Sequence, residues 1–314
     1  MNPTKLLSLI VPVYFEEDCI EQYLLETTAV LKQHQIHYEI VFVDDGSKDK
    51  TAQMIKKAAA DNQRLKLLEF SYNHGKQAAL TAGIAHAKGD YLLMMDPDLQ
   101  DPPEEIPRFI QKIEEGYDLV FGVRKEKKDT LKNRLFSGIF WWILEKFTGL
   151  HLPRGIAVMR IFNRNFANHF LKYGEASRFI EGIFMHISMN RTELLIEQRP
   201  RFAGVSKFNF KRKLNLAFDA ILDFSDLPLK IITRLGLYLV LAGFLAAFGI
   251  TFSKLFLVDF QIGWASIMVL FILGLGTQLI FMGVIGIYVG KIYKEVKNRP
   301  LYSIKNKTNI SDNA

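Results

Sequence analysis

In residues 91–105, YLLMMDPDLQDPPEE, an apolar run ends in two aspartates, Asp96 and Asp98. The short, continuous apolar run is typical of a buried strand, and the proline pair that follows favours the start of a helix. Carboxylates at the end of a buried strand supply the hard oxygen ligands that Mg²⁺ or Mn²⁺ requires. We therefore expect a metal site at Asp96 and Asp98, with Gln100 as a further oxygen ligand and Asp101 as a helix cap.

The sequence on either side of this stretch alternates between strand patterns and helix patterns. Strands are expected at 6–13, 38–45, 64–70, 91–96 and 118–123, and helices at 17–34, 50–61, 76–87 and 103–115. Nearly continuous apolar strands separated by helices indicate a Rossmann-like α/β domain whose mainly parallel sheet is covered on both faces. Ligands bind beyond the carboxyl ends of such strands.

Polar residues follow the first two expected strands. Pro12, Tyr14 and Glu16 come at the end of the first strand, where they can shape a slot for a base, although an acidic cluster there is more often a solvated helix start. Asp44 and Asp45 end the second strand, and alone they would be read as a turn with a helix cap. Their position beside the first group favours a shared binding site.

The C-terminal part changes character. Amphipathic, aromatic-rich or basic segments at 131–147 and 208–232 are predicted to be interfacial helices, with ordinary domain-packing helices as the alternative. Two runs without charged residues, 235–253 and 264–290, are each long enough to cross a hydrocarbon core of roughly 30 Å, and the first helix is expected to extend to about residue 257. We therefore expect a catalytic domain over 1–207 and a two-helix transmembrane hairpin over 233–290.

The basic tail at 291–314 predicts the orientation of the hairpin. Its lysines and arginines place it in the cytosol, on the same side as the catalytic domain. The protein is thus expected to be a multi-pass protein of the inner (cytoplasmic) membrane, with a polar, frayed end at 306–314. Glycines along the second span would permit close helix packing, including the packing of a homo-oligomer.

Composition limits the partners. The 314 residues carry a formal net charge of +7 and one cysteine, Cys19. No nucleic-acid-binding signature is present, so we expect no nucleic-acid partner and assign the basic charge to membrane lipid and phosphorylated substrates. A single cysteine excludes an intrachain disulfide, and the N-terminus lacks a signal-peptide pattern, so the soluble part is expected in the cytosol.

Four segments together carry a resemblance to a known family: PVYFEE (12–17), VDDGSKDKT (43–51), NHGKQAALTAG (73–83) and DPDLQDPPE (96–104). They resemble the family 2 glycosyltransferases of the GT-A fold. Within that family the likeness is to polyprenyl-phosphate glycosyltransferases, such as dolichol-phosphate mannose synthase and bacterial undecaprenyl-phosphate sugar transferases, and it covers nearly the whole chain. Phe15 departs from the family pattern, which has an asparagine there.

The resemblance implies roles for individual residues. The expected nucleotide contacts are Pro12, Tyr14, Glu16, Asp44, Asp45, Lys76 and Asp96, with Arg201 and Lys207 of RPRFAGVSKF completing a cage around the diphosphate. Asp98 and Arg124 are the expected catalytic residues, and Asp96, Asp98 and Gln100 the expected metal ligands. Lys132, Arg134, Ser137 and Arg160 are the expected contacts of the lipid phosphate. Each basic residue alone would be read as a surface charge.

One segment departs from the family. Ile156 and Ala157 follow Gly155 where relatives carry an acidic residue proposed as a base, so no base is assigned. A phosphate acceptor is already mostly dianionic at neutral pH and needs positioning more than proton removal. The resemblance thus implies metal-dependent, inverting transfer from a nucleotide sugar, with UDP expected, to undecaprenyl phosphate. The alternatives are a processive polysaccharide synthase, disfavoured by only two spans, and a non-catalytic membrane scaffold.

Overall fold

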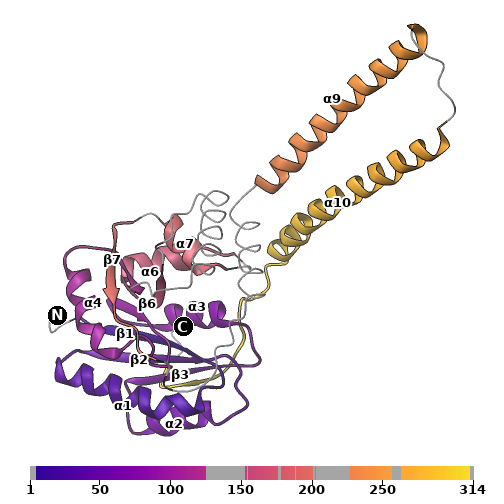
Figure 1. The fold of residues 1–314 in the computed structure, drawn as a ribbon. Helices are drawn as coiled ribbons and strands as arrows, with labels where there is room; N and C mark the ends of the chain where they lie inside the picture. The colour runs from indigo at the N-terminus through magenta and orange to yellow at the C-terminus, as the bar shows by residue number, and fades with distance from the viewer. Residues whose placement is uncertain are drawn as a thin grey trace. The chain divides into compact units, whose positions relative to one another are not determined.

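The computed structural model describes residues 5–124, 153, 155–175, 178–187, 189–200, 202, 227–256 and 263–311. The chain forms two compact units: Met1–Leu214 together with Pro300–Ala314, and Asn215–Arg299 (Figure 1). The predicted amphipathic helix at 131–147, and the part of the 208–232 helix up to residue 226, lie outside the described residues.

The first unit is built on a mixed, mainly parallel sheet, which confirms the predicted α/β class. Its strand order in the described part of the chain is β7-β5-β6-β4-β1-β2-β3-β8. The strands are β1 (Leu7–Val13), β2 (Tyr38–Asp44), β3 (Leu65–Phe70), β4 (Tyr91–Met94), β5 (Leu119–Arg124), β6 (Ile156–Asn163), β7 (Arg191–Ile196) and β8 (Ile304–Thr308). Strand β1 pairs in parallel with both β2 and β4, whereas β6 and β8 run antiparallel to their neighbours.

Helices cover both faces of this sheet, as Figure 1 shows. On one side lie α1 (Glu17–Gln33), α2 (Thr51–Ala60), the 3₁₀ turn η1 (Pro103–Glu105) and α4 (Ile106–Glu114). On the other lie α3 (Lys76–His86), α6 (Arg164–Leu171) and α7 (Ile180–His186). Helix α1 shows why the pattern works: Ile20, Tyr23, Thr27 and Leu31 recur at helical spacing and are all buried against the core.

The C-terminal residues are ordered as part of the sheet. Strand β8 pairs antiparallel with β3 and forms the edge of the sheet, and beyond it the Asn309 side-chain amide donates to the carbonyl oxygens of Ala59 (2.8 Å) and Leu65 (2.9 Å). The prediction of a frayed end at 306–314 is therefore wrong through Ser311. The tail is polar because much of β8 faces solvent, but its backbone satisfies the open hydrogen-bonding edge of β3.

The second unit contains two long helices in its described part, α9 (Leu227–Phe256) and α10 (Trp264–Val296). The segments Leu229–Ile250 and Leu270–Val296 are long and apolar enough to cross a membrane. Large apolar side chains such as Phe244 and Phe248 are exposed along α9, as expected of a lipid-facing helix. The two helices indicate membrane association.

Gly122 in β5 offers a test of how tightly the sheet is packed. A Cβ at this position would lie 2.5 Å from the Met159 carbonyl oxygen and 3.1 Å from Phe109 Cζ. We expect Gly122→Ala to lower the free energy of unfolding by about 1–3 kcal/mol, because backbone and a buried ring must shift. Gly174→Ala is the control, since a Cβ there meets no atom within 4 Å. Equal thermal unfolding midpoints for the two variants would contradict the described packing.

Candidate active site

The candidate site lies where the strand order changes direction. Because β1 pairs in parallel with β2 on one side and with β4 on the other, the loops that leave β1 and β4 lie next to each other at the carboxyl ends of the strands, where ligands bind in such sheets. Both loops contain a non-glycine residue in the left-handed region, Phe15 with φ 54° and Leu99 with φ 56°. Such strained backbone concentrates at functional sites.

The loop after β1 is hydrogen-bonded to the loop after β2. Phe15 N donates to Ser47 Oγ at 3.0 Å, and Glu16 N donates to Thr51 Oγ1 at 3.0 Å. Asp44 lies at the end of β2 and accepts from Ser47 N at 3.2 Å; burial raises the pKa of its carboxyl, and the Ser47 hydrogen bonds partly oppose that rise.

Proline and aromatic side chains lie at the end of β1 and in the loop that follows it. Pro12 is buried in β1 opposite Val43. The Tyr14 and Phe15 rings meet edge to face with centroids 4.6 Å apart, and Phe15 is 42% exposed. An exposed aromatic ring on a strained backbone is available to a planar ligand such as a base.

Asp45 organises the neighbouring loop. Its two carboxylate oxygens accept from His74 N at 2.6 Å and from Gly75 N at 2.9 Å. Burial raises the pKa of Asp45, and the two backbone N–H groups partly oppose that rise. Gly75 has φ 95°, a conformation that a glycine adopts without strain, and α3 begins at the next residue, Lys76. Asp45 therefore fixes the backbone just before α3, which begins at Lys76.

Lys76 reaches the first aspartate of the strand-end pair. Its Nζ lies 2.7 Å from both carboxylate oxygens of Asp96. Asp98 is buried and accepts from Gln100 N at 3.1 Å, so the side chain of Asp98 and the backbone of Gln100 share one tight turn. Among the described residues, no group of three or more His, Cys, Asp or Glu side chains is arranged to hold a metal ion. A metal at Asp96 and Asp98 would thus need further ligands from a bound molecule and water.

Asp101 does not cap the following helix, which corrects the prediction. Its Oδ1 accepts from Arg124 Nε (3.1 Å) and Nη2 (2.8 Å), and its Oδ2 accepts from Met159 N (3.3 Å). The prolines after Asp101 lack N–H groups, and the Glu105 N–H is already bonded to the Pro102 carbonyl. The buried carboxylate instead fixes Arg124 at the carboxyl end of β5.

Residues 155–157, where relatives carry an acidic residue, also lie at this edge of the sheet. Arg124 N donates to the Gly155 carbonyl oxygen at 2.9 Å, and Ile156 is paired with Val123 as β6 begins. Residues 156 and 157 therefore contribute no carboxylate near Arg124, whose acidic partner is Asp101.

The Arg160 side chain is buried on β6 and is not exposed to solvent. Its Nη2 donates to Glu181 Oε1 at 3.1 Å and to the Ala157 carbonyl oxygen at 3.0 Å, and Nη1 has no hydrogen-bond partner within the described structure. Sequence reasoning did not single out Glu181, because its partner is 21 residues away. The remaining predicted site residues lie outside the described residues: Lys132, Arg134, Ser137, Arg201 and Lys207.

Similarity to known proteins extends over most of the chain. A model described as glycosyl transferase family 2 matches residues 8–170. The chain is 38% identical over 304 residues to an uncharacterized glycosyltransferase of Synechocystis sp., covering 95% of this chain and 94% of the relative. It is 33% identical over 310 residues to undecaprenyl-phosphate 4-deoxy-4-formamido-L-arabinose transferase of Pseudomonas fluorescens, covering 96% and 90%.

A solved structure shares the fold. The crystal structure of glucosyl-3-phosphoglycerate synthase from Mycobacterium tuberculosis with Mg²⁺ and UDP superposes with a TM-score of 0.51 at 16% identity, covering 70% of this chain and 78% of that one. At this identity the likeness concerns the fold alone, and it agrees with the predicted GT-A architecture.

The raised pKa of Asp45 makes stability depend on pH. The folded protein binds a proton at Asp45 at pH values where the unfolded chain, with the ordinary pKa of 3.8, has released it. Its contribution to the free energy of unfolding is complete below pH 3.8 and is lost as the pH rises through the raised value. As the pH rises from 3.8 to neutrality, the thermal midpoint of the wild type should therefore fall relative to that of Asp45→Asn. Parallel curves for the two proteins would contradict this expectation.

Proposed function

This chain belongs to glycosyl transferase family 2, and we propose that it transfers a sugar from a nucleotide sugar to undecaprenyl phosphate. The observation that carries the proposal is the Asp96–Asp98 pair at the strand-order switch, with a lysine on Asp96 and Arg124 fixed nearby. Relatives named undecaprenyl-phosphate 4-deoxy-4-formamido-L-arabinose transferase match along nearly their whole length, which supports a polyprenyl phosphate acceptor.

The donor would lie against the loops that follow β1, β2 and β4. The nucleoside would lie against Tyr14, Phe15 and Asp44, at the corner where an exposed ring stands beside a buried carboxylate. UDP is the proposed nucleotide, the one held by the solved structure of the same fold. The diphosphate would extend toward Lys76 and Asp96.

The side chains present fit a divalent cation at Asp96 and Asp98. Both are hard oxygen donors, and the Lys76 ammonium group on both oxygens of Asp96 shows that the position favours positive charge. Two carboxylates leave most of an octahedral shell to phosphate oxygens and water, as Mg²⁺ or Mn²⁺ sites commonly do. When bound, the ion would neutralise charge that develops on the leaving diphosphate.

The chain's own residues would supply positioning. The acceptor is a phosphate monoester that is already mostly dianionic, so its oxygen can attack the anomeric carbon without a base at positions 156 and 157. That oxygen forms the new bond to the sugar from the face opposite the nucleoside diphosphate, which departs with the electrons of the broken bond. Arg124, which is held by Asp101, would bind phosphate oxygens with charge-assisted hydrogen bonds.

The proposed membrane orientation follows from the chain path. The chain leaves the first unit, forms two apolar helices, and returns to the first unit as β8. An even number of crossings would keep both ends of the hairpin on the cytosolic side, in agreement with the basic residues after Gly290. The proposed arrangement is an inner-membrane protein with catalytic domain 1–207 in the cytosol.

The transfer reaction is tested with full-length protein, Mn²⁺, a panel of nucleotide sugars and undecaprenyl phosphate. We expect Asp98→Asn to lower the transfer rate by at least about 100-fold, because a weakened metal ligand removes several kcal/mol of stabilisation from the leaving group. Asp61→Asn, at the exposed end of α2, is the matched control. A wild type that forms no lipid-linked sugar with any donor, or one that uses only free-sugar acceptors, would contradict the proposal.

Lys76 should affect metal and donor in opposite directions. Lys76→Gln removes the cation that competes for Asp96, so Mn²⁺ alone should bind more tightly, as measured by calorimetry. The same change removes a charged contact to the diphosphate and should raise the KM for the nucleotide sugar about tenfold. Lys57→Gln, on the exposed side of α2, should change neither quantity. A KM equal to that of the wild type would show that Lys76 does not contact the donor.

A further inference from the structure

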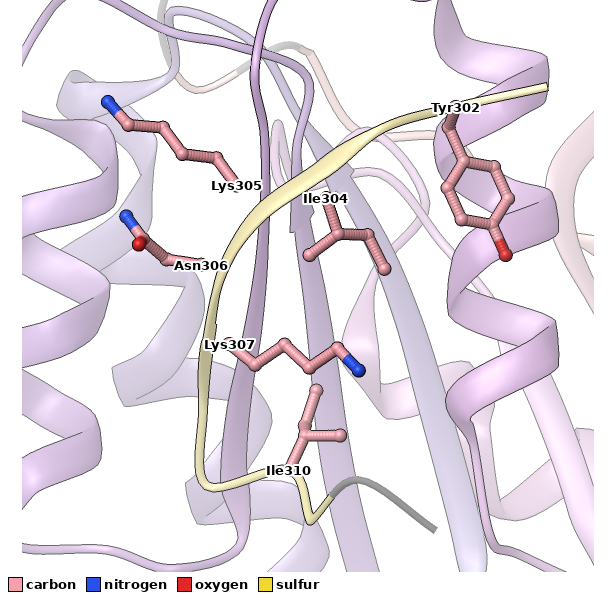
Figure 2. Close-up of a pocket in the computed structure, with 6 residues that line it drawn as sticks. All are labelled: Tyr302, Ile304, Lys305, Asn306, Lys307 and Ile310. Atoms are coloured by element: carbon pink, nitrogen blue, oxygen red, sulfur yellow. The ribbon is translucent and has the colours of Figure 1, made fainter. Parts of the chain in front are cut away.

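The residues that follow the second apolar helix lie against the strand that leads into the donor site. This return segment, residues 300–311, contains β8 and pairs with β3. Ser71 N donates to the Ser303 carbonyl oxygen at 3.0 Å, and the Tyr302 ring stacks on Phe70 with centroids 5.2 Å apart and planes 7° from parallel. In Figure 2, the Tyr302 side chain points to the opposite side of the segment from Lys305 and Asn306.

The segment then contacts the loop that ends in Lys76. Ser303 N donates to His74 Nε2 at 3.2 Å, and the His74 ring lies 5.3 Å from that of Phe70 and 4.0 Å from that of Tyr72. The His74 backbone N–H is one of the two that Asp45 accepts. An unbroken set of contacts therefore runs from Ser303 through His74 to the start of α3, where Lys76 binds Asp96.

The segment is fixed at its far end as well. Asn309 binds the carbonyl oxygens of Ala59 and Leu65, and its φ of 57° is a conformation that asparagine tolerates. Residues from both sides of the segment, Tyr302 and Lys305 among them, line an open hollow of about 650 Å³. Lys305 and Asn306, which point away from Tyr302 in Figure 2, are exposed to solvent.

We propose that the return segment is a positioning element for the donor site, in which Tyr302 and Ser303 hold the loop 71–75 and thereby place Lys76 at Asp96. The physical reason is that this loop belongs to no helix or strand and contains a glycine at positive φ, so its order must come from contacts with other parts of the chain. Asp45 supplies one such contact and the return segment supplies the other. The proposal rests on the proposed function, in which Lys76 and Asp96 bind the donor diphosphate.

Full-length protein in lipid nanodiscs tests the proposal with two disrupting variants, Tyr302→Ala and His74→Ala. Tyr302→Phe keeps the stacked ring, and His74→Gln keeps an acceptor for Ser303 N. Both conservative variants should therefore behave nearly like the wild type in exchange and in KM. Lys305→Ala, on the exposed face, is the matched control. Amide hydrogen exchange over 71–80 reports the order of the loop, and steady-state kinetics separate KM from kcat.

We expect Tyr302→Ala and His74→Ala to speed exchange at 73–76 and to raise the KM for the nucleotide sugar about tenfold, with little change in kcat, because the diphosphate contact is misplaced. Unchanged exchange, or faster exchange with the KM of the wild type, would overturn the proposal. If the wild type itself transfers no sugar, the proposed function fails. The exchange data alone then decide whether the segment orders the loop, and unchanged exchange rejects that as well.

Discussion

The parallel pairing of β1 with both β2 and β4 determines where the residues of the candidate site lie. It aligns Val13 with Asp44 and Ile10 with Met94, so the residues that follow each strand emerge at one edge. It also forces α3 to cross to the face opposite α1 and α2, because crossovers between parallel strands are right-handed. The positions of the start of α3 at Lys76 and of the Asp96–Asp98 turn both follow from that single arrangement.

The acidic residues at this edge differ in how firmly their partners hold them. Asp101 is 2% exposed and paired with Arg124, and Asp45 accepts two backbone N–H groups, so neither is easily released to a ligand. Asp96 is 23% exposed and its partner Lys76 is 47% exposed, so this ion pair lies open to solvent and can exchange partners. The structure therefore separates two carboxylates that hold neighbouring backbone and side chains in place from the Asp96 carboxylate, which is accessible to solvent.

Local sequence pattern predicted the first five strands and the helices between them within a few residues, because each is a continuous apolar run or an amphipathic repeat. The antiparallel insertion of β6 between β4 and β5, and the polar strand β8, were missed because pairing between distant segments leaves no local pattern. Asp101 was assigned to a helix cap for the same reason, since its partner Arg124 is 23 residues away. His74 and Glu181 likewise act through contacts distant in sequence. The motif residues were predictable because their place depends only on where strands end.

In the proposed mechanism, Asp96 and Asp98 hold a metal ion that also binds the donor diphosphate. Pulsed electron–nuclear double resonance tests this on Mn²⁺ retained with the full-length protein in the presence of UDP. The expected result is ³¹P hyperfine coupling on protein-bound Mn²⁺, lost in the Asp96→Asn, Asp98→Asn double variant. Mn²⁺ that does not stay with the wild-type protein, or equal coupling in the double variant, would contradict the metal-bound donor site.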